Sequence, residues 1–578
     1  MNKKRKKTIS LFVLIIGFLV STSSINTFNT KALVDGTHDQ YNLDSNDISI
    51  LEWSMTEVVS TESIYPTSDP SIAVDSIGNV YVVWHEGSDY GGSGADADIF
   101  YKRWDSSTTS WSITEVISTE SSAPSYHPTI LVDSVNNVHI AWDDSTNYAG
   151  AGTDYDIFYK CWNASTSSWT TTEVVTTESV YISSNPSLAV DSAGNIHIAW
   201  EFFNGNTWYA IHYKRWNSST SSWTTPEIVS TEGTTAVYNP SLAVDSSDNI
   251  HVAWEDYTNY AGAGTDYDIF YKCWISSTSS WTTTEVVSTE STGNSVNPSL
   301  AVDSSDNIHV AWDDSTNYTN CGADADIFYK HWISSTSSWT TTEVVSTEST
   351  GHSYRPSLAV DSAGNIHVAW EDSTNYTNCG TDYDIFYKCW DASTSSWTIT
   401  EVVSTESTDG SNYPSLIIDS NFRIHVAWRD QTNYTNCGTD WDIFYKQAYL
   451  LLLPTTPELA FIVPNPIDVN TVLLDWNNIS TATNYYIYRS DYYIWSVEGM
   501  IPIATVSSSI YVDTLPSEGY YYYVIAAENL AGNSSHSNCQ YVEYKIPHVR
   551  EFAIISGLIL GTFVIALVIM RTRKRNLN

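Results

Sequence analysis

Carboxylates recur at a fixed spacing along most of the chain. In six segments an acid stands two residues after a tryptophan, and an Asp-x-Asp pair begins ten residues later. If the carboxylate oxygens of a set lie close together, they could bind Ca²⁺, which takes about 6–8 oxygen ligands. The alternative is that these side chains cap turns through their own backbone. Apart from this possible Ca²⁺, the sequence indicates no required cofactor. The six sets are Glu86/Asp96/Asp98, Asp144/Asp154/Asp156, Asp256/Asp266/Asp268, Asp314/Asp324/Asp326, Asp372/Asp382/Asp384 and Asp430/Asp440/Asp442.

A seventh segment breaks this pattern. It lacks all three acids and carries Phe202, Phe203 and Trp208 instead, in a repeat of 54 rather than 58 residues. We therefore predict that these three aromatic residues take part in ligand binding. Drift of a surface loop explains the departure equally well.

The segments belong to a sequence repeat. The phrase Pro-Ser-Leu-Ala-Val-Asp, or a near copy, begins at seven prolines with spacings of 58, 58, 54, 58, 58 and 58 residues. Each repeat has four short runs of alternating apolar residues, rich in β-branched types and separated by Gly, Asn and Ser, which indicates strands. Four strands are the unit of a β-propeller blade. The prolines are Pro70, Pro128, Pro186, Pro240, Pro298, Pro356 and Pro414.

The two ends of the repeat array complete one another. The seventh repeat stops after its third strand, at Lys446, and an extra copy of the fourth strand begins at Trp53, before the first repeat. An N-terminal strand that completes the last blade would close the ring and leave no open sheet edge. The sequence therefore predicts an all-β fold whose main part is a seven-bladed β-propeller over residues 53–449.

Turns of the type Val-Asp-Ser-x-Gly-Asn, and Asp-Ile-Phe-Tyr-Lys in the third strand, resemble sialidase-like propellers of the Asp-box type. The strict Asp-box order is not kept, and a shared fold does not carry function. A true sialidase would need three arginines around the substrate carboxylate, a Tyr/Glu nucleophile pair and an Asp acid. Tyr354-Arg355-Pro356 is similar to a sialidase Phe-Arg-Ile-Pro motif, which implies a ligand-binding role for Arg355. The few arginines of the array speak against a triad: Arg103, Arg215, Arg355, Arg423 and Arg429.

Six histidines share one position in the second strand of their repeats. Metal ligands must lie within about 2 Å of one ion, and equivalent positions on adjacent blades lie too far apart for that. We expect these histidines to be structural and to form hydrogen bonds between blades. They are His139, His197, His251, His309, His367 and His425.

Both ends of the chain indicate export and membrane attachment. A basic cluster at 3–7 and an apolar run at 9–20 are typical of a signal peptide over residues 1–34, or of an uncleaved anchor, followed by a linker at 35–52. Residues 552–570 are uncharged, about long enough to cross a bilayer, and precede a basic cytoplasmic tail at 571–578. Seven glycosylation sequons suit an exported chain: Asn163, Asn217, Asn317, Asn375, Asn433, Asn478 and Asn533.

A second module follows a linker at 450–456. Residues 457–545 show a new strand pattern that looks like a fibronectin type III domain, with Trp476 as its core tryptophan. Either Tyr521 or Tyr523 could supply the tyrosine corner of that fold. Such modules usually act as spacers.

The net charge of 25 − 66 = −41 arises from a shortage of Lys and Arg. Nucleic acid is therefore excluded as a partner, because neutralising phosphates needs clustered cations. We expect a cell-surface receptor or adhesin, held in the cell membrane by its C-terminal helix, that binds an extracellular glycan or protein through the propeller loops without catalysis. The alternatives are a sialidase-like glycoside-processing enzyme and a structural cell-envelope protein.

Overall fold

The computed structural model describes residues 48–205, 209–233, 236–319, 321–322, 324–452, 454–479, 482–529 and 532–546. These residues form strands, turns and loops and contain no helix, as the all-β prediction requires. Among them, therefore, no helix is long and apolar enough to span a membrane. The predicted signal peptide, membrane helix and basic tail lie outside the described residues.

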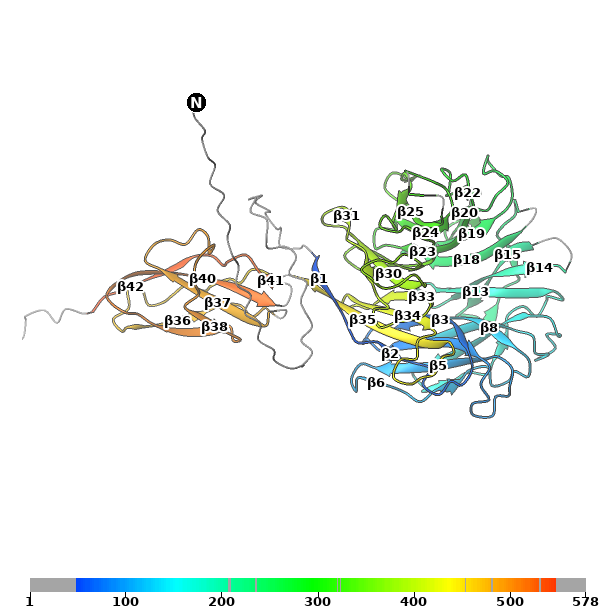
Figure 1. Ribbon diagram of the computed structural model, residues 1–578, viewed down its shortest axis with the longest axis horizontal. Coiled ribbons are helices and arrows are strands. Elements are labelled where there is room, and N and C mark those ends of the chain that lie inside the picture. Colours follow the sequence, from blue (N-terminus) through cyan, green and yellow to red (C-terminus); the bar gives the residue numbers. More distant parts are fainter. Residues whose placement is uncertain are drawn as a thin grey trace, which may run out of the picture. The chain divides into compact units, whose positions relative to one another are not determined.

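Seven five-stranded antiparallel sheets form the blades of a propeller (Figure 1). The innermost strands are β3 (Thr67–Val74), β8 (Ser125–Val132), β13 (Ile182–Val190), β18 (Val237–Val244), β23 (Ser295–Val302), β28 (Ser353–Val360) and β33 (Ser411–Ile418). The second strands are β4 (Val80–Glu86), β9 (Val138–Asp144), β14 (Ile196–Phe203), β19 (Ile250–Asp256), β24 (Ile308–Asp314), β29 (Ile366–Asp372) and β34 (Arg423–Asp430). The third strands are β5 (Asp98–Asp105), β10 (Asp156–Asn163), β15 (Tyr209–Asn217), β20 (Asp268–Ile275), β25 (Asp326–Ile333), β30 (Asp384–Asp391) and β35 (Asp442–Leu452).

The predicted fourth strand is interrupted in every blade and consists of two short pieces that both pair with the third strand. In blades one to six these are β6 (Ser110–Trp111) and β7 (Glu115–Val116), β11 (Ser168–Trp169) and β12 (Glu173–Val174), β16 (Ser222–Trp223) and β17 (Glu227–Ile228), β21 (Ser280–Trp281) and β22 (Glu285–Val286), β26 (Ser338–Trp339) and β27 (Glu343–Val344), and β31 (Ser396–Trp397) and β32 (Glu401–Val402).

The N-terminal strand closes the ring, as the sequence predicts. β1 (Ile48–Trp53) and β2 (Glu57–Val58) both pair with β35, the third strand of the seventh blade. Each innermost strand also contacts the innermost strand of the next blade, and β33 contacts β3. β1 begins five residues before the predicted start, and β35 extends to Leu452, into the predicted linker.

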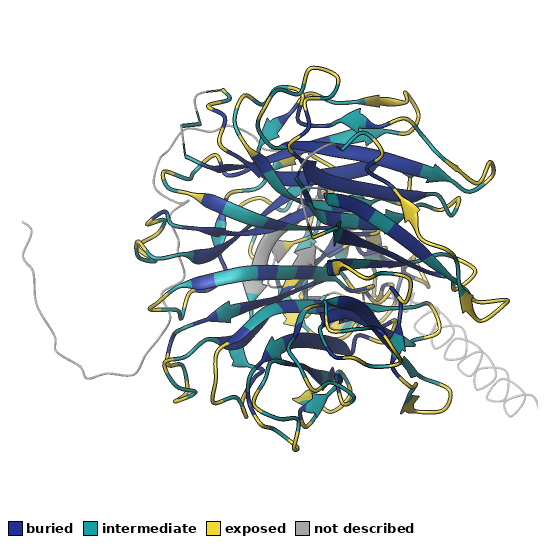
Figure 2. Ribbon diagram, turned by 90° about the vertical axis from the view of Figure 1, so that its right-hand side faces the viewer, coloured by how far each residue is buried: buried dark blue, intermediate teal, exposed yellow. Residues whose placement is uncertain are grey.

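The core of the propeller lies between the blades. The second strands are buried along most of their length, as is the first part of each third strand, whereas many residues of the connecting loops are exposed (Figure 2). The tryptophan near the end of each second strand is almost fully buried, and Trp142 for example packs with residues of the preceding blade such as Tyr101. Burial of seven such side chains between neighbouring sheets explains why the blades are held together without a further element.

The repeated histidines are structural, but the prediction that they join neighbouring blades is wrong. The Nδ1 atom of His139 lies 2.6 Å from the hydroxyl of Tyr159, on the adjacent strand of the same blade, and its Nε2 atom lies 3.3 Å from Asp133 in the preceding turn. His197, His251, His309, His367 and His425 make the corresponding tyrosine contact within their own blades. In the antiparallel register His139 stands opposite Cys161, so Tyr159 lies two residues further along the same strand, in a diagonal position within reach of the imidazole.

The C-terminal module contains two sheets that share one apolar core. Its strands are β36 (Thr471–Asp475), β37 (Asn484–Ser490), β38 (Ala504–Val506), β39 (Ile510–Thr514), β40 (Gly519–Asn529), β41 (Gly532–Asn533) and β42 (Gln540–Tyr544). Trp476 is buried in this core against Tyr485. The hydroxyl of Tyr521 donates to the backbone oxygen of Ser517, four residues upstream, at 2.9 Å, whereas that of Tyr523 donates to Asp513.

Candidate functional site

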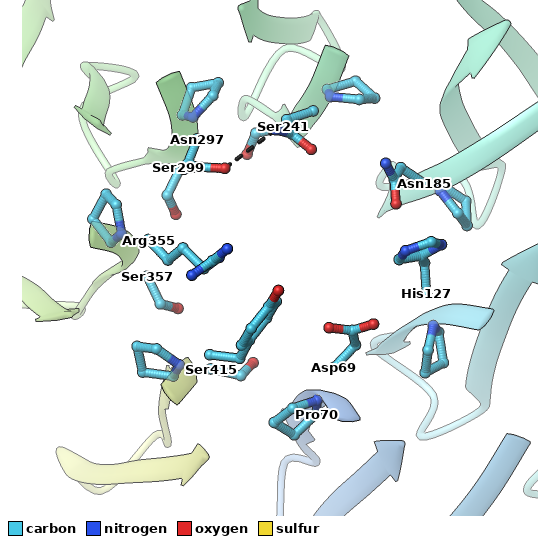
Figure 3. A pocket seen from close by; sticks show the side chains of 18 of the residues that line it. Asp69, Pro70, His127, Asn185, Ser241, Asn297, Ser299, Arg355, Ser357 and Ser415 are labelled. Carbon is cyan, nitrogen blue, oxygen red and sulfur yellow. Dashed lines mark hydrogen bonds between the residues drawn. The ribbon is translucent and has the colours of Figure 1, made fainter. Parts of the chain in front are cut away.

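A cavity of about 560 Å³ lies at the centre of the propeller, where the seven innermost strands meet (Figure 3). It is lined by the repeated prolines, by neighbouring serines and by the residue that precedes each proline. Proline usually restricts the preceding residue to extended conformations. Here all seven preceding residues instead have φ between 47° and 55°: Asp69, His127, Asn185, Asn239, Asn297, Arg355 and Tyr413. We call these seven residues the channel ring.

The unusual backbone of the channel ring coincides with a register shift in each innermost strand, for example between Tyr126 and Thr129. A bulge of this kind re-aims a side chain. In Figure 3 Arg355 and His127 point into the cavity from opposite sides, with Asp69 near His127. The bulges therefore turn seven side chains of differing chemistry toward one space.

Buried carboxylates hold five of these bulges in place. The residue after the buried tryptophan of the second strand is an acid in five blades, and its carboxylate accepts the backbone N–H of the channel-ring residue of the next blade at 2.8–3.2 Å. Because a buried carboxylate needs hydrogen-bond donors, these bonds fix the strained backbone. The five acids are Asp143, Glu201, Glu255, Asp313 and Glu371.

The acid series stops in blades seven and one, where the same position holds Arg429 and His85. A guanidinium cannot accept a backbone N–H, and Arg429 instead donates to the hydroxyl of Ser68 at 2.7 Å. The guanidinium groups of Arg429 and Arg355 lie 4.3 and 4.2 Å from the centroid of the Tyr413 ring. The seven blades are therefore not equivalent around the central cavity. On the side of blades six and seven, two arginine side chains contact the ring of Tyr413.

Neighbouring charges and burial set the protonation states around the cavity. Although burial opposes it, the hydrogen bond from His127 to Asp143, 2.8 Å long, raises the pKa of His127 to about 9. Burial raises the pKa values of Glu201 and Asp313 to about 7. Burial lowers the pKa of His85 to about 4. At neutral pH two cationic groups line the cavity: Arg355, which is paired with the buried Glu371, and His127, which is paired with Asp143. Arg429 does not line the cavity but contacts the lining residues Ser68 and Tyr413.

The remaining arginines of the propeller lie elsewhere. Arg103 forms an ion pair with Asp105, Arg215 lies over Trp274, and Arg423 lies over Tyr449. The lysine of each third strand is buried, and Lys160 for example donates to the backbone oxygen of Ile117 and to Glu120. Among the described arginines of the propeller, Arg355 lines the central cavity and Arg429 contacts its lining residues Ser68 and Tyr413, whereas a sialidase-type triad needs three arginines.

The predicted ligand-binding residues do not form a single site. Arg355 lines the central cavity, whereas Phe202 lines a separate cavity of about 280 Å³ in blade three. Phe203 stacks on Tyr209 at the ends of β14 and β15, with 4.4 Å between ring centroids. Trp208 lies outside the described residues.

The sequence did not single out the other members of the channel ring. Their side chains face the cavity only because a bulge interrupts the two-residue alternation of the strand. One signal was available: the residue before Pro-Ser or Pro-Thr is Asp, His, Asn, Asn, Asn, Arg and Tyr in successive repeats, whereas the two residues after it scarcely change. Variation beside a constant Pro-Ser or Pro-Thr pair indicates a place where the blades differ.

The first and third acids of the predicted calcium sets contact their own chain. In blade two, Asp144 accepts hydrogen bonds from the indole of Trp142, the hydroxyl of Ser125 and the backbone N–H of Thr146. Asp256, Asp314 and Asp372 likewise accept from a tryptophan indole and a threonine N–H. The third acids, Asp156, Asp268, Asp326 and Asp384, each accept the hydroxyl of a serine or threonine through Oδ1.

The second acid of each set is turned toward its own loop. Asp154, Asp266, Asp324 and Asp382 are half-buried, and Oδ1 of each lies against the positive-φ glycine two residues earlier, where a side chain would collide with it. The first and third acids of a set stand opposite each other on paired strands, as Asp144 and Asp156 do, and each also accepts hydrogen bonds from its own chain. Within the described ranges no group of three His, Cys, Asp or Glu side chains is arranged to hold a metal ion. Calcium binding itself stays a prediction.

The predicted glycosylation sites differ in exposure. Asn317, Asn375, Asn433, Asn478 and Asn533 are exposed. Asn163 and Asn217 are half-buried, and the side-chain oxygen of each accepts hydrogen bonds from the turn that follows it. The five exposed asparagines are the better placed to be modified.

No protein-family model and no curated protein matches the chain. Among solved structures, a protein of unknown function from Dyadobacter fermentans is 9% identical, with a TM-score of 0.42 over 69% of this chain and 99% of that one. An ulvan lyase of polysaccharide lyase family PL25 is 12% identical, with a TM-score of 0.44 over 66% and 93%. A leech intramolecular trans-sialidase is 12% identical, with a TM-score of 0.35 over 68% of each chain.

Proposed function

We propose that this protein is a cell-surface receptor or adhesin whose central propeller cavity binds an acidic glycan without turning it over. In this proposal residues 1–34 direct export, residues 552–570 anchor the chain, and the C-terminal module is a fibronectin type III spacer. The hydrogen bond from Tyr521 to Ser517 supports that last assignment, because a tyrosine corner makes such a bond to backbone a few residues upstream.

The observation that carries the proposal is that Arg355 and His127 line one cavity, with Arg429 over the ring of the lining residue Tyr413, in a chain of net charge −41. Arginine and protonated histidine form charge-assisted hydrogen bonds with carboxylate or sulfate groups. Asn185 and Asn297, on the same ring, carry amide groups of the kind that hold sugar hydroxyls; one N–H of each donates to Glu201 or Asp313, and the second N–H remains for a ligand. A saccharide that carries an acidic group could interact with the cationic side chains through that group and with the asparagine amides through its hydroxyls.

The placement of the carboxylates supports binding without hydrolysis. Most glycosidases need two carboxyl groups that flank the scissile bond. Among the residues that line the cavity, Asp69 is the one that carries a carboxylate. Glu371 and the other second-strand acids are buried and bonded to backbone N–H groups.

A second candidate is a glycoside-processing enzyme related to sialidases. Tyr413 beside Arg355 and Arg429 is the observation that favours it. The receptor and the enzyme can be distinguished by a screen of the full chain on a glycan array. Each bound glycan is then analysed by mass spectrometry after incubation. Retention of intact acidic glycans is the expected result, and release of a shortened sugar or an unsaturated product would establish the enzyme instead.

A further inference from the structure

Blade three contains a cavity of about 280 Å³ that is separate from the channel ring. Val180, Tyr181, Phe202 and Pro226 supply its apolar lining, and Ser183 and Trp200 lie at buried positions within it. These residues come from the segment that leads into blade three and from the strands of that blade. The six other blades show what normally occupies this place.

In those six blades the indole N–H of the buried tryptophan donates to the acid two residues later, at 2.7–3.1 Å. In four of them the same carboxylate oxygen also accepts the hydroxyl of the serine that begins the innermost strand. In blade two Asp144 Oδ2 accepts from Trp142 at 3.1 Å and from Ser125 at 2.6 Å. Blades five, six and seven repeat this arrangement with Ser295, Ser353 and Ser411.

Blade three keeps both donors and lacks the acceptor. Phe202 stands where the acid would be, and its ring stacks on His212 of β15, with 4.4 Å between centroids. Trp200 is 2% exposed and Ser183 is fully buried. Neither Trp200 Nε1 nor Ser183 Oγ has a hydrogen-bond partner among the residues that the structure describes. A buried donor without an acceptor is costly, so these two groups favour any ligand oxygen that reaches them.

Blade three also lacks an aromatic pair that the other six blades share. In the other six blades a loop tyrosine packs on the phenylalanine of the third strand, as Tyr148 does on Phe158. The shorter loop of blade three has no tyrosine at that place, and His212 replaces the phenylalanine. Loss of the acid and of the tyrosine accounts for a cavity in this blade.

We propose that this cavity binds a small molecule in which a carboxylate is attached to an apolar or aromatic body. The carboxylate accepts the indole N–H of Trp200 and the hydroxyl of Ser183, and the apolar body packs against Val180, Tyr181, Phe202 and Pro226. The chain itself supplies the precedent, because an aspartate or glutamate carboxylate occupies the corresponding place in six blades.

The neighbouring charges are compatible with an acidic ligand. Glu178 also lines the cavity, but its carboxylate is paired with Lys214 at 2.8 Å. In blade four the corresponding pair is Glu232 and Lys272, and Glu232 lies close enough to the buried Asp256 to act on the pKa of that carboxyl, which burial above all raises. A carboxylate beside such a pair is therefore already present in the fold.

Isothermal titration calorimetry of the full chain with phenylacetate tests the proposal, with 2-phenylethylammonium as a probe of opposite charge. We expect one phenylacetate per chain and no binding of the ammonium probe. Ser183→Ala should weaken phenylacetate binding about tenfold, because it removes a hydrogen bond to a charged group. Phe202→Asp restores the acid of the other blades and should abolish binding while raising the thermal midpoint.

Ser295→Ala in blade five is the matched control, since Ser295 is bonded to Asp314 and should not affect the affinity. Thermal midpoints of all variants exclude loss of the fold as the cause of weaker binding. The proposal is overturned if phenylacetate does not bind, if both probes bind equally, or if Ser183→Ala and Phe202→Asp leave the affinity unchanged. It does not depend on the function of the central cavity.

Discussion

The indole Nε1 atom of Trp53 donates a 2.9 Å hydrogen bond to Oε2 of Glu401, which lies 348 residues further along the chain. The Trp53 ring also meets that of Tyr387 edge to face at 5.5 Å. Trp111 makes the same two contacts, with Glu57 and Tyr445. The strand from the N-terminus therefore joins its neighbouring blade by the contacts that join blades elsewhere in the ring.

Trp53→Phe should destabilise the closed ring, because it leaves the half-buried Glu401 carboxylate without its indole donor. We expect a loss of about 1–2 kcal/mol in the free energy of unfolding. Trp169→Phe is the matched control, since Trp169 makes the same bond to Glu115 between two internal blades. Denaturant unfolding should give similar losses for both variants; a Trp53→Phe variant as stable as the natural chain would show that closure does not use this bond.

The pH dependence of stability follows from buried carboxyl groups. Burial raises the pKa values of eight of them to about 6 or 7, so the folded chain binds more protons than the unfolded chain between about pH 4 and 7. Their contribution to stability is present below pH 4 and is lost as the pH rises through 7. They are Asp98, Asp156, Glu201, Asp268, Asp313, Asp326, Asp384 and Asp442.

Five histidines oppose this trend. Burial lowers the pKa values of His85, His212 and His331 to about 4 and those of His197 and His425 below the usual value, so their contribution is lost as the pH falls below 6.5. Although burial opposes it, neighbouring groups raise the pKa values of His127 and His367 to about 9, so these two act in the same direction as the eight carboxyl groups. Together the ten groups outweigh the five histidines, and the thermal midpoint should be higher at pH 5 than at pH 8, by about 5 °C or more. Scanning calorimetry in matched salt measures this directly. A midpoint that increases from pH 5 to pH 8 is incompatible with the proposed protonation states.

Calcium should have little effect on stability, because the first acid of each set already accepts hydrogen bonds from its own chain, as Asp144 does. We expect millimolar Ca²⁺ to shift the thermal midpoint at pH 8 by less than about 1 °C, since a ligand of the folded state stabilises only in proportion to its occupancy. A saturable rise that Asp154→Asn/Asp156→Asn reduces would establish calcium sites in the acidic loops.

The architecture could be predicted because the same pattern of strands and turns occurs in seven successive repeats. Strand alternation, turn residues and the displaced copy at Trp53 agree on a closed ring, and β1 and β2 pair with β35 as expected. The partner of each repeated histidine could not be predicted, since it depends on which side chains the register places side by side. His139 meets Tyr159 of its own blade for that reason.

The candidate site was predicted less well than the fold. Arg355 was identified through a family resemblance, but Asp69, His127 and Tyr413 were not. A bulge with positive φ turns these residues into the cavity, and alternation within a strand does not reveal a bulge. The sequence shows that blade three departs from the repeat. That the departure leaves two buried hydrogen-bond donors, at Ser183 and Trp200, can be recognised only from the packing of the folded chain.

The most direct test of the central claim is the affinity of the full chain for the acidic glycan that binds best on the array, compared with that of Arg355→Gln/Glu371→Gln. The double substitution removes the guanidinium without leaving its buried partner charged. Arg103→Gln/Asp105→Asn, an ion pair outside the cavity, is the control. Calorimetry should show a loss of about tenfold or more for the first variant and none for the second. Equal affinity of all three proteins would contradict binding at the central cavity.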